Sequence, residues 1–158
     1  PAVKAGLATG LPFTLHAGEA GPVDNVAVSL TLGAQRIGHG VHMSGFPATI
    51  NQAKRAGATI EMCPTSNVQT KAVADYAAFP LAEFLSAGLK VTLNTDDRTV
   101  SDVTLTSEIM RMHDEFGLNW SLLEQLTLNA IDGAFLNDPA KEKLRERVRA
   151  AASTVSQA

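Results

Sequence analysis

The apolar and polar positions of the chain alternate in a regular way. Short apolar, β-favouring runs occur at residues 13–15, at Ile37, at 59–62 and at 91–93, and each leads into a polar stretch. Between these runs, apolar residues recur at the three- and four-residue spacing of an amphipathic helix. The helical patterns cover residues 23–32, 48–56 and 81–87. Strands that alternate with helices of this length predict right-handed parallel βαβ units.

A glycine closes a helical pattern in front of each apolar run, which suits the left-handed conformation just past a helix end. These glycines are Gly6, Gly33, Gly57 and Gly88. We therefore expect four strand–helix units. Because a complete (β/α)8 barrel usually needs about 250 residues, a chain of 158 residues predicts half of one. An open doubly wound sheet is the alternative, although no Gly-x-Gly-x-x-Gly phosphate loop follows a strand.

The C-terminal third is predicted to be mostly helical. Residues 105–116 carry apolar side chains at helical spacing, and Gly117 follows as a stop. Ser121 and Glu124 predict a capping box at the start of the next helix. Three methionines, Met62, Met110 and Met112, are expected to fill the core.

Both ends of the chain also carry helical patterns. Residues 1–8 are expected to form the C-terminal end of a helix whose start lies before residue 1. A last helix is expected to begin at Asp138, with Leu144 and Val148 facing inward. Residues after Ala152 are expected to fray, as chain ends without packing commonly do.

Composition narrows the class of protein. The chain is 45% hydrophobic and 18% charged, with a formal net charge of −3, so nothing indicates a polyanionic partner such as a nucleic acid. No apolar run approaches the roughly 20 residues of a membrane helix. The single cysteine, Cys63, excludes a disulfide framework, favours a reducing cytoplasm and is expected to be a small buried residue. Since the chain starts at Pro1 and shows no signal-peptide pattern, we expect it to begin within a larger protein.

Candidate reactive residues stand where the predicted strands end. His16 closes the first strand, and a neutral imidazole at such a position is a common metal ligand. Gly18 allows a tight turn, after which Glu19 lies close enough for general acid–base catalysis. Each residue also has a structural interpretation. His16 could be hydrogen-bonded within the fold, and Glu19 could be an acid in the first turn of the following helix.

A second histidine lies between two glycines. Gly38 and Gly40 remove side-chain bulk around His39, so that another group can approach its ring closely. A tight turn capped by the histidine is the alternative. His42 would point to the opposite side of an extended chain, and His113 is expected on a helix surface.

Two adjacent acids, Asp96 and Asp97, follow the last apolar run. Neighbouring carboxylates are costly in a dry site unless a cation or hydrogen bonds stabilise them. Both carboxylates would be stabilised if one bound a metal ion and the other accepted a hydrogen bond from a ligand. A solvated Asx turn is the alternative. Thr65, Ser66 and Asn67 either line the same rim or form a turn. Because barrel strands deliver side chains to one rim, the whole set predicts a metal-dependent hydrolytic site.

Four motifs, in chain order, resemble those of the adenosine deaminases within the amidohydrolase barrels. They are His-Ala-Gly-Glu at 16–19, Arg-Ile-Gly-His-Gly-Val at 36–41, Cys-Pro-Thr-Ser-Asn-Val-Gln-Thr at 63–70 and Asn-Thr-Asp-Asp at 94–97. The resemblance extends from about Leu11 to Phe135. Within the family, the style of the sequence is similar to that of the bacterial members. It implies that residues 1–158 are the C-terminal half of a single (β/α)8 TIM-type barrel whose N-terminal half is absent.

The resemblance also implies residue roles around one Zn²⁺ per complete barrel. His16 and Asp96 would be zinc ligands. Glu19 would donate a proton to ring N1 of a purine, His39 would orient and polarise the attacking water, and Asp97 would hydrogen-bond purine N7. The family has two more zinc ligands in a His-x-His pair on its first strand, and this chain contains no such pair.

The implied activity of the full-length protein is hydrolytic deamination of adenosine or deoxyadenosine to inosine or deoxyinosine in purine salvage. A deaminase of adenine or of a modified adenosine is an alternative, although Gln69 and Thr70 favour adenosine. Arg98, where the family often has proline, bears on substrate preference. A further alternative is a non-catalytic binding or assembly fragment, because only two expected zinc ligands are present. We expect a small-molecule nucleoside substrate, no membrane partner and little activity from the isolated chain.

Overall fold

Four short parallel strands form the centre of the structure, which is a computed structural model that describes residues 2–155. They are β1 (Thr14–Ala17), β2 (Arg36–His39), β3 (Thr59–Met62) and β4 (Lys90–Leu93). Their order in the sheet is β1-β2-β3-β4, the order of the sequence, and every neighbouring pair is parallel. A doubly wound sheet would reverse its strand order at a switch point, so the barrel-type prediction is confirmed.

One face of this sheet packs against the helices and forms the hydrophobic core with them. Leu15, Ile37, Ile60 and Val91 lie in register across the four strands. The last three of these side chains are fully buried, in one apolar cluster with residues of the helices that follow β1 and β2. Since successive side chains of a strand point to opposite faces, the residues next to them face the other side, the interior of a barrel. His16 is one of these inward-facing residues.

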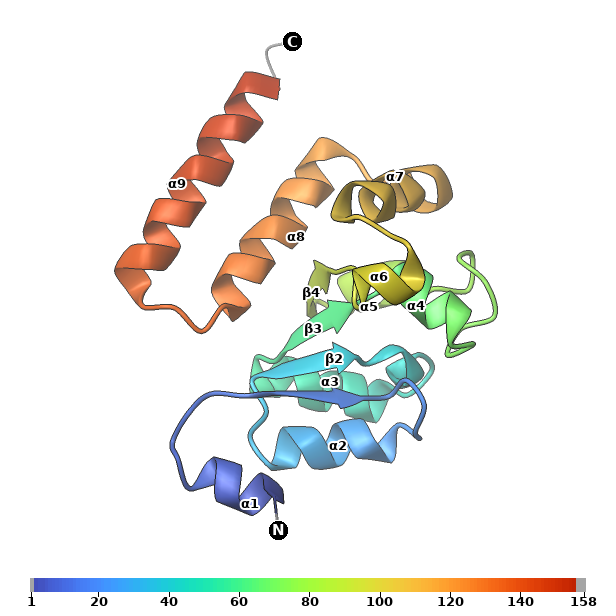
Figure 1. Ribbon diagram of the computed structural model, residues 1–158, viewed down its shortest axis with the longest axis vertical. Coiled ribbons are helices and arrows are strands. Elements are labelled where there is room, and N and C mark those ends of the chain that lie inside the picture. Colours follow the sequence, from blue (N-terminus) through green and yellow to red (C-terminus); the bar gives the residue numbers. More distant parts are fainter. Residues whose placement is uncertain (1, 156–158) are drawn as a thin grey trace.

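Helices cover the outside of the sheet, and the last helices of the chain lie beyond β4 (Figure 1). The helix α1 (Ala2–Leu7) precedes β1, and α2 (Asp24–Thr31) and α3 (Pro47–Ala56) pack together against the outer face. The short 3₁₀ helix η1 (Val41–Met43) follows β2, whereas α4 (Pro64–Gln69) and α5 (Leu81–Ser86) connect β3 to β4. After β4 come α6 (Arg98–Ser101), α7 (Leu105–Phe116), α8 (Trp120–Gly133) and α9 (Asp138–Val155). The helix α8 packs on β4, and α9 lies alongside α8.

A charged pair links the strands on the inner face. Glu61 of β3 accepts a hydrogen bond from the Thr14 hydroxyl at 2.7 Å and pairs with the Arg36 guanidinium. The same guanidinium lies 4.8 Å from the ring centre of Phe135, which follows α8. These contacts join β1, β2 and β3 beneath the strand ends and so help to fix the positions of those ends.

Several local predictions are wrong. Gly6 lies inside α1, and Gly10 is the residue with positive φ after it. The predicted capping box at Ser121 and Glu124 does not form, because α8 begins two residues earlier than that box implies, with Asn119 as the cap whose side chain accepts from the Leu122 N–H.

The capping box of this region lies one helix earlier, between Thr104 and Ser107 of α7. Met110 is 53% exposed rather than in the core. Leu144 and Val148 are half-buried. The last helix runs on to Val155 rather than fraying after Ala152, and residues 156–158 lie outside the described residues.

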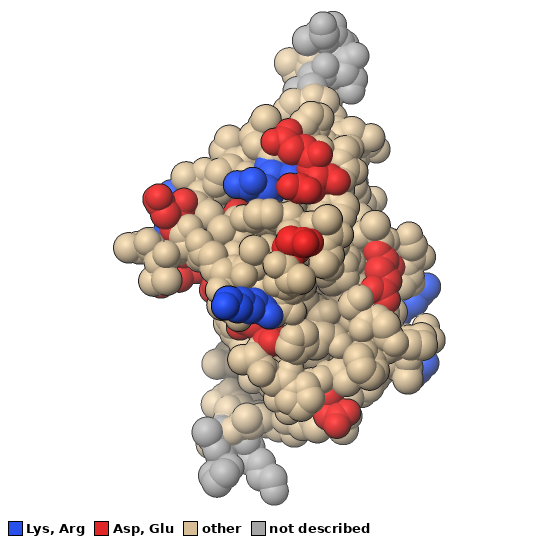
Figure 2. Space-filling model, turned by 90° about the vertical axis from the view of Figure 1, so that its right-hand side faces the viewer, with Lys and Arg blue, Asp and Glu red and all other residues tan. Residues whose placement is uncertain are grey.

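On the face shown in Figure 2, basic side chains lie among acidic ones instead of gathering in one patch. Within residues 2–155, no helix combines the length and the hydropathy needed to cross a membrane.

Candidate active site

The ends of the strands bring predicted site residues together. His16 lies in β1, His39 ends β2 and Asp96 follows β4. One potential ligand atom from each of these three side chains lies within 4.8 Å of the others. The two imidazole rings have centroids 4.9 Å apart and are tilted by 53°. Residues from three strands therefore meet at one rim, as the sequence predicted.

Glycine is required where the two histidines approach each other. A Cβ atom on Gly38 would lie 3.1 Å from Cγ of the His16 ring. That separation is tighter than an ordinary carbon–carbon contact, so a larger residue would displace the ring. The sequence prediction that the glycines beside His39 admit another group is confirmed, and the group admitted is His16.

Two site residues adopt strained backbone conformations. His39 has φ of 67° and Asp96 has φ of 58°, values that few residues other than glycine adopt. Such conformations cost about 1–3 kcal/mol each and persist where the surrounding structure imposes them, commonly at functional sites. His39 is the last residue of β2, and Asp96 lies in the loop between β4 and α6.

His39 is buried and has partners on both ring nitrogens. Its Nε2 lies 3.4 Å from Oε2 of Glu19, and its Nδ1 lies 3.1 Å from Nδ2 of Asn67. Burial lowers the pKa of His39, opposed by the charge of Glu19 and assisted by His16. The ring is therefore neutral at pH 7. With Nδ2 of Asn67 as the donor to Nδ1, the ring proton lies on Nε2, toward Glu19, and among the described residues this orientation leaves Oδ1 of Asn67 buried with no hydrogen-bond partner.

The two adjacent aspartates have separate surroundings. Asp96 Oδ2 accepts a hydrogen bond from the Ser66 hydroxyl at 2.7 Å. Asp97 is the N-cap of α6, and its Oδ1 accepts from the backbone N–H groups of Thr99 and Val100, each at 2.9 Å. Asp96 thus belongs to the histidine cluster, whereas Asp97 stands beside it with one oxygen committed to the helix.

The donor set of the cluster fits a zinc ion. Imidazole and carboxylate are both ligands that catalytic zinc sites use, in sets of three protein groups with an open position, and His16 and Asp96 supply one of each. His16 and Asp96 are exposed, whereas His39 is buried. His39 differs, because with its proton on Nε2 it presents an N–H donor. That arrangement suits a hydrogen-bonding role, and the separate roles of these residues stay predictions.

Sequence reasoning underrated the residues of α4. Ser66 and Asn67 contact Asp96 and His39, and the Thr70 hydroxyl donates to Oε1 of Glu19 at 3.2 Å. The signal that could have found them is the proline at position 64, because proline favours the first turn of a helix. A helix there would have carried these polar groups toward the rim.

The remaining candidates have structural surroundings. Both ring nitrogens of His42 face backbone carbonyls, of Gly21 at 2.8 Å and Ala72 at 3.2 Å. His113 is exposed, as expected, and contacts a carbonyl through Nδ1. Cys63 is buried, and burial together with nearby carboxylates raises the pKa of its thiol. None of these groups is poised for chemistry.

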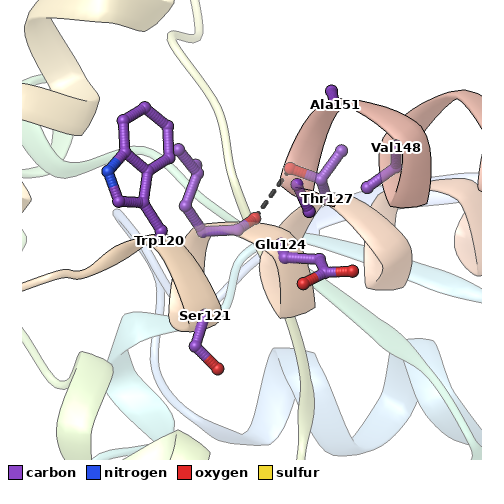
Figure 3. Close-up of a pocket in the computed structure, with 8 residues that line it drawn as sticks. Trp120, Ser121, Glu124, Thr127, Val148 and Ala151 are labelled. Carbon is purple, nitrogen blue, oxygen red and sulfur yellow. Dashed lines mark hydrogen bonds between the residues drawn. The ribbon is translucent and has the colours of Figure 1, made fainter. Parts of the chain in front are cut away.

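A separate hollow lies between α8 and α9 (Figure 3) and has a volume of about 440 Å³. It is lined by Trp120, Ser121, Leu123, Glu124, Thr127, Val148, Ala151 and Ala152. The Thr127 hydroxyl is satisfied within the helix by the Leu123 carbonyl at 2.7 Å. This hollow shares no residue with the histidine cluster, so its apolar lining has no part in the candidate chemistry.

Known proteins resemble the chain over almost its whole length. The sequence profile of the adenosine deaminase family matches residues 2–151. An adenosine deaminase from Enterococcus faecalis is 46% identical over 138 residues, which cover 87% of this chain and 41% of that protein. The chain therefore spans less than half the length of this relative.

Solved structures show the same relation in three dimensions. An adenine deaminase from Arthrobacter aurescens matches with a TM-score of 0.90 at 26% identity, over 96% of this chain and 46% of its own. An amidohydrolase from Burkholderia ambifaria, solved with bound Zn, matches with a TM-score of 0.88 at 27% identity. That match covers 99% of this chain and 44% of the solved one. The fold described above is therefore part of a TIM-type barrel.

Proposed function

The chain belongs to the adenosine deaminase family, and on this basis we propose that it forms the C-terminal half of a barrel that deaminates adenosine or deoxyadenosine. The products would be inosine or deoxyinosine and ammonia, which is a step of purine salvage. The family match over residues 2–151 supports the assignment. The observation that carries it is the meeting of His16, His39 and Asp96 at one rim, with Glu19 beside them.

Zinc is the metal that the donor set and the family favour. His16 and Asp96 would hold it, and further ligands would come from strands outside this chain. When bound, zinc acts as a Lewis acid and lowers the pKa of a water molecule from 15.7 to about 7. The amidohydrolase from Burkholderia ambifaria, a structural relative, contains bound Zn.

Glu19 would supply the proton that the reaction needs. Attack of water at C6 of the purine breaks the aromaticity of the ring, which is costly unless ring N1 is protonated at the same time. The water oxygen then becomes bonded to C6 and the water gives up both protons. One replaces the proton that Glu19 gave to N1, and the other goes to the amino group, which leaves as ammonia when the C6–N bond breaks. Glu19 lies between the His39 N–H and the Thr70 hydroxyl, which would hold its carboxyl group in place.

His39 and Asp97 would orient the reactants. The single N–H of the neutral His39 ring, which faces Glu19 in this structure, would turn to the attacking water in the reaction and orient it without bringing a positive charge. Asp97 would hydrogen-bond purine N7 through its second carboxyl oxygen, because Oδ1 already accepts from two backbone N–H groups.

Part of the machinery lies outside this chain. The chain corresponds to 41% of the length of the Enterococcus faecalis relative, and a catalytic zinc site needs at least one more protein ligand than His16 and Asp96. We propose that the missing strands and ligands come from a segment equivalent to the part of that relative before the matched region. The isolated chain is expected to show little deaminase activity.

A deaminase of adenine is the second candidate, because the adenine deaminase from Arthrobacter aurescens matches the fold with a TM-score of 0.90. The test uses a hybrid barrel, in which the part of the Enterococcus faecalis relative before its matched region is joined to this chain. Initial rates on adenosine, deoxyadenosine and adenine would be measured side by side. Faster turnover of the two nucleosides is expected, whereas turnover of adenine alone would favour the second candidate.

A further inference from the structure

Helix α4 and Thr70, the residue that directly follows it, contact three of the residues proposed for the chemistry, each through a different side chain. All three contacts are hydrogen bonds made by polar groups on one side of a short segment. The pairs are Ser66 with Asp96 at 2.7 Å, Asn67 with His39 at 3.1 Å and Thr70 with Glu19 at 3.2 Å. The placement of α4 therefore determines how the donors that orient the reactive groups are arranged.

The sequence of α4 itself does little to hold the helix in place. It has six residues, and helices this short have marginal stability on their own. Its N-cap residue, Cys63, makes no side-chain hydrogen bond to the helix. The first backbone N–H groups of a helix have no partner within it, so α4 needs a cap from elsewhere.

A distant carboxylate supplies this cap. Glu108 lies in the first turn of α7 and is 1% exposed. One of its oxygens accepts from the backbone N–H of Thr65 at 2.9 Å, and the other accepts from the Thr65 hydroxyl. That hydroxyl also lies 3.1 Å from the hydroxyl of Tyr76. A negative charge at a helix N-terminus is stabilising because the helix dipole is positive there.

The hydrogen bonds of the Glu108 carboxylate go to Thr65 in the first turn of α4. Burying a carboxylate is costly unless it is hydrogen-bonded. Among residues 2–155, no ion pair involves Glu108, and both of its oxygens are bonded to Thr65. We propose that Glu108 is a positioning residue, which caps α4 and thereby holds Ser66, Asn67 and Thr70 against the reactive groups. This inference rests on the proposed deaminase function.

The test compares variants of the hybrid barrel. Glu108→Gln replaces a charged acceptor by an amide, and Thr65→Val removes the hydroxyl donor while keeping the backbone N–H. Thr65→Ser keeps both donors and is the conservative variant. Glu115→Gln, on the exposed side of the same helix, is the matched control. Two readouts are used: kcat and KM on adenosine, and the ¹⁵N chemical shifts of the His39 ring at fixed pH.

Glu108→Gln and Thr65→Val are expected to lower kcat by about 10- to 100-fold, the usual effect of losing an outer partner, with KM changed less than about threefold. Both variants should shift the His39 ring signals, whereas Thr65→Ser and Glu115→Gln should leave them in place.

Folded Glu108→Gln and Thr65→Val proteins with unchanged signals and kcat would overturn the inference. If Glu108→Gln does not fold, unchanged His39 signals in Thr65→Val would overturn it alone. If the unmodified hybrid barrel deaminates nothing, the proposed function fails, while the His39 signals still decide the role of Glu108.

Discussion

The amide Nδ2 of Asn67 lies 3.1 Å from Nδ1 of the buried His39 ring. This contact joins a residue from the helix after β3 to one at the end of β2. It leaves the ring proton on Nε2, facing Glu19 at 3.4 Å. The protonation pattern of His39 therefore depends on a side chain that has no direct part in the proposed chemistry.

Asn67→Ala is expected to damage both stability and activity. His39 is 1% exposed, so its Nδ1 would lose a partner that water cannot easily replace. Leaving a buried polar group unpaired costs about 1–3 kcal/mol, which urea unfolding would measure. In the hybrid barrel, kcat on adenosine should fall by about 10-fold or more. Asn51→Ala, at an exposed position of α3, is the control, and equal behaviour of the two variants would contradict the assignment.

Gly38→Ala should weaken zinc binding through His16. The added Cβ would lie 3.1 Å from the His16 ring, so the ring would have to shift by a few tenths of an ångström within the cluster. We expect zinc affinity, measured by competition with a chelating dye, to fall by about tenfold. Gly6→Ala is the control, because a Cβ there meets nothing within 4 Å and alanine favours a helix by about 1 kcal/mol over glycine. Undiminished zinc affinity in Gly38→Ala would show that the ring has room to adjust.

Stability should fall as the pH drops below the ordinary titration range of histidine. Burial lowers the pKa of His39 below its ordinary value of 6.5, so below pH 6.5 the unfolded chain binds a proton that the folded chain does not. The free energy of unfolding should be level above that pH and decrease from there down to the lowered pKa. Urea titrations between pH 5.5 and 8 would measure this. His113→Asn should keep the same profile, and stability that increases on acidification would contradict the buried neutral ring.

The thiol of Cys63 should be inert in the folded protein. Burial raises its pKa above the ordinary value of 9.0, and nearby carboxylates act in the same direction. Since each pKa unit lowers the thiolate fraction about tenfold, a disulfide reagent at pH 8 should react at least about tenfold faster in urea than with the folded chain. By linkage, stability should be complete below pH 9 and decrease as the pH rises further. Rapid labelling without urea would contradict the buried position.

Much of the fold could be predicted from local patterns. The apolar runs place all four strands to within a few residues, because strands buried against helices need apolar side chains in short segments. Gly33, Gly57 and Gly88 do adopt positive φ after helices. The cap of α8 was misplaced because Asn119 and Ser121 both suit an N-cap, and only the path of the chain decides between them.

The candidate site was predictable only in part. His16, His39 and Asp96 could be brought together because parallel strands end at a common rim. The contact between Thr65 and Glu108 could not, because it joins residues 43 positions apart through a side chain buried on a helix. Nothing in the local sequence around Glu108 distinguishes it from an ordinary acid in the first turn of a helix.

Glu19→Gln in the hybrid barrel tests the central claim most directly, because the amide can still form hydrogen bonds but cannot deliver a proton to the purine. The measurement is the steady-state rate of adenosine consumption, with Glu146→Gln on the exposed side of α9 as the matched control. General acid–base catalysis contributes about 10²- to 10⁴-fold, so the account predicts a rate at least about 100-fold lower for Glu19→Gln and an unchanged rate for the control. Turnover by Glu19→Gln within about tenfold of the unmodified protein would contradict the proposed role.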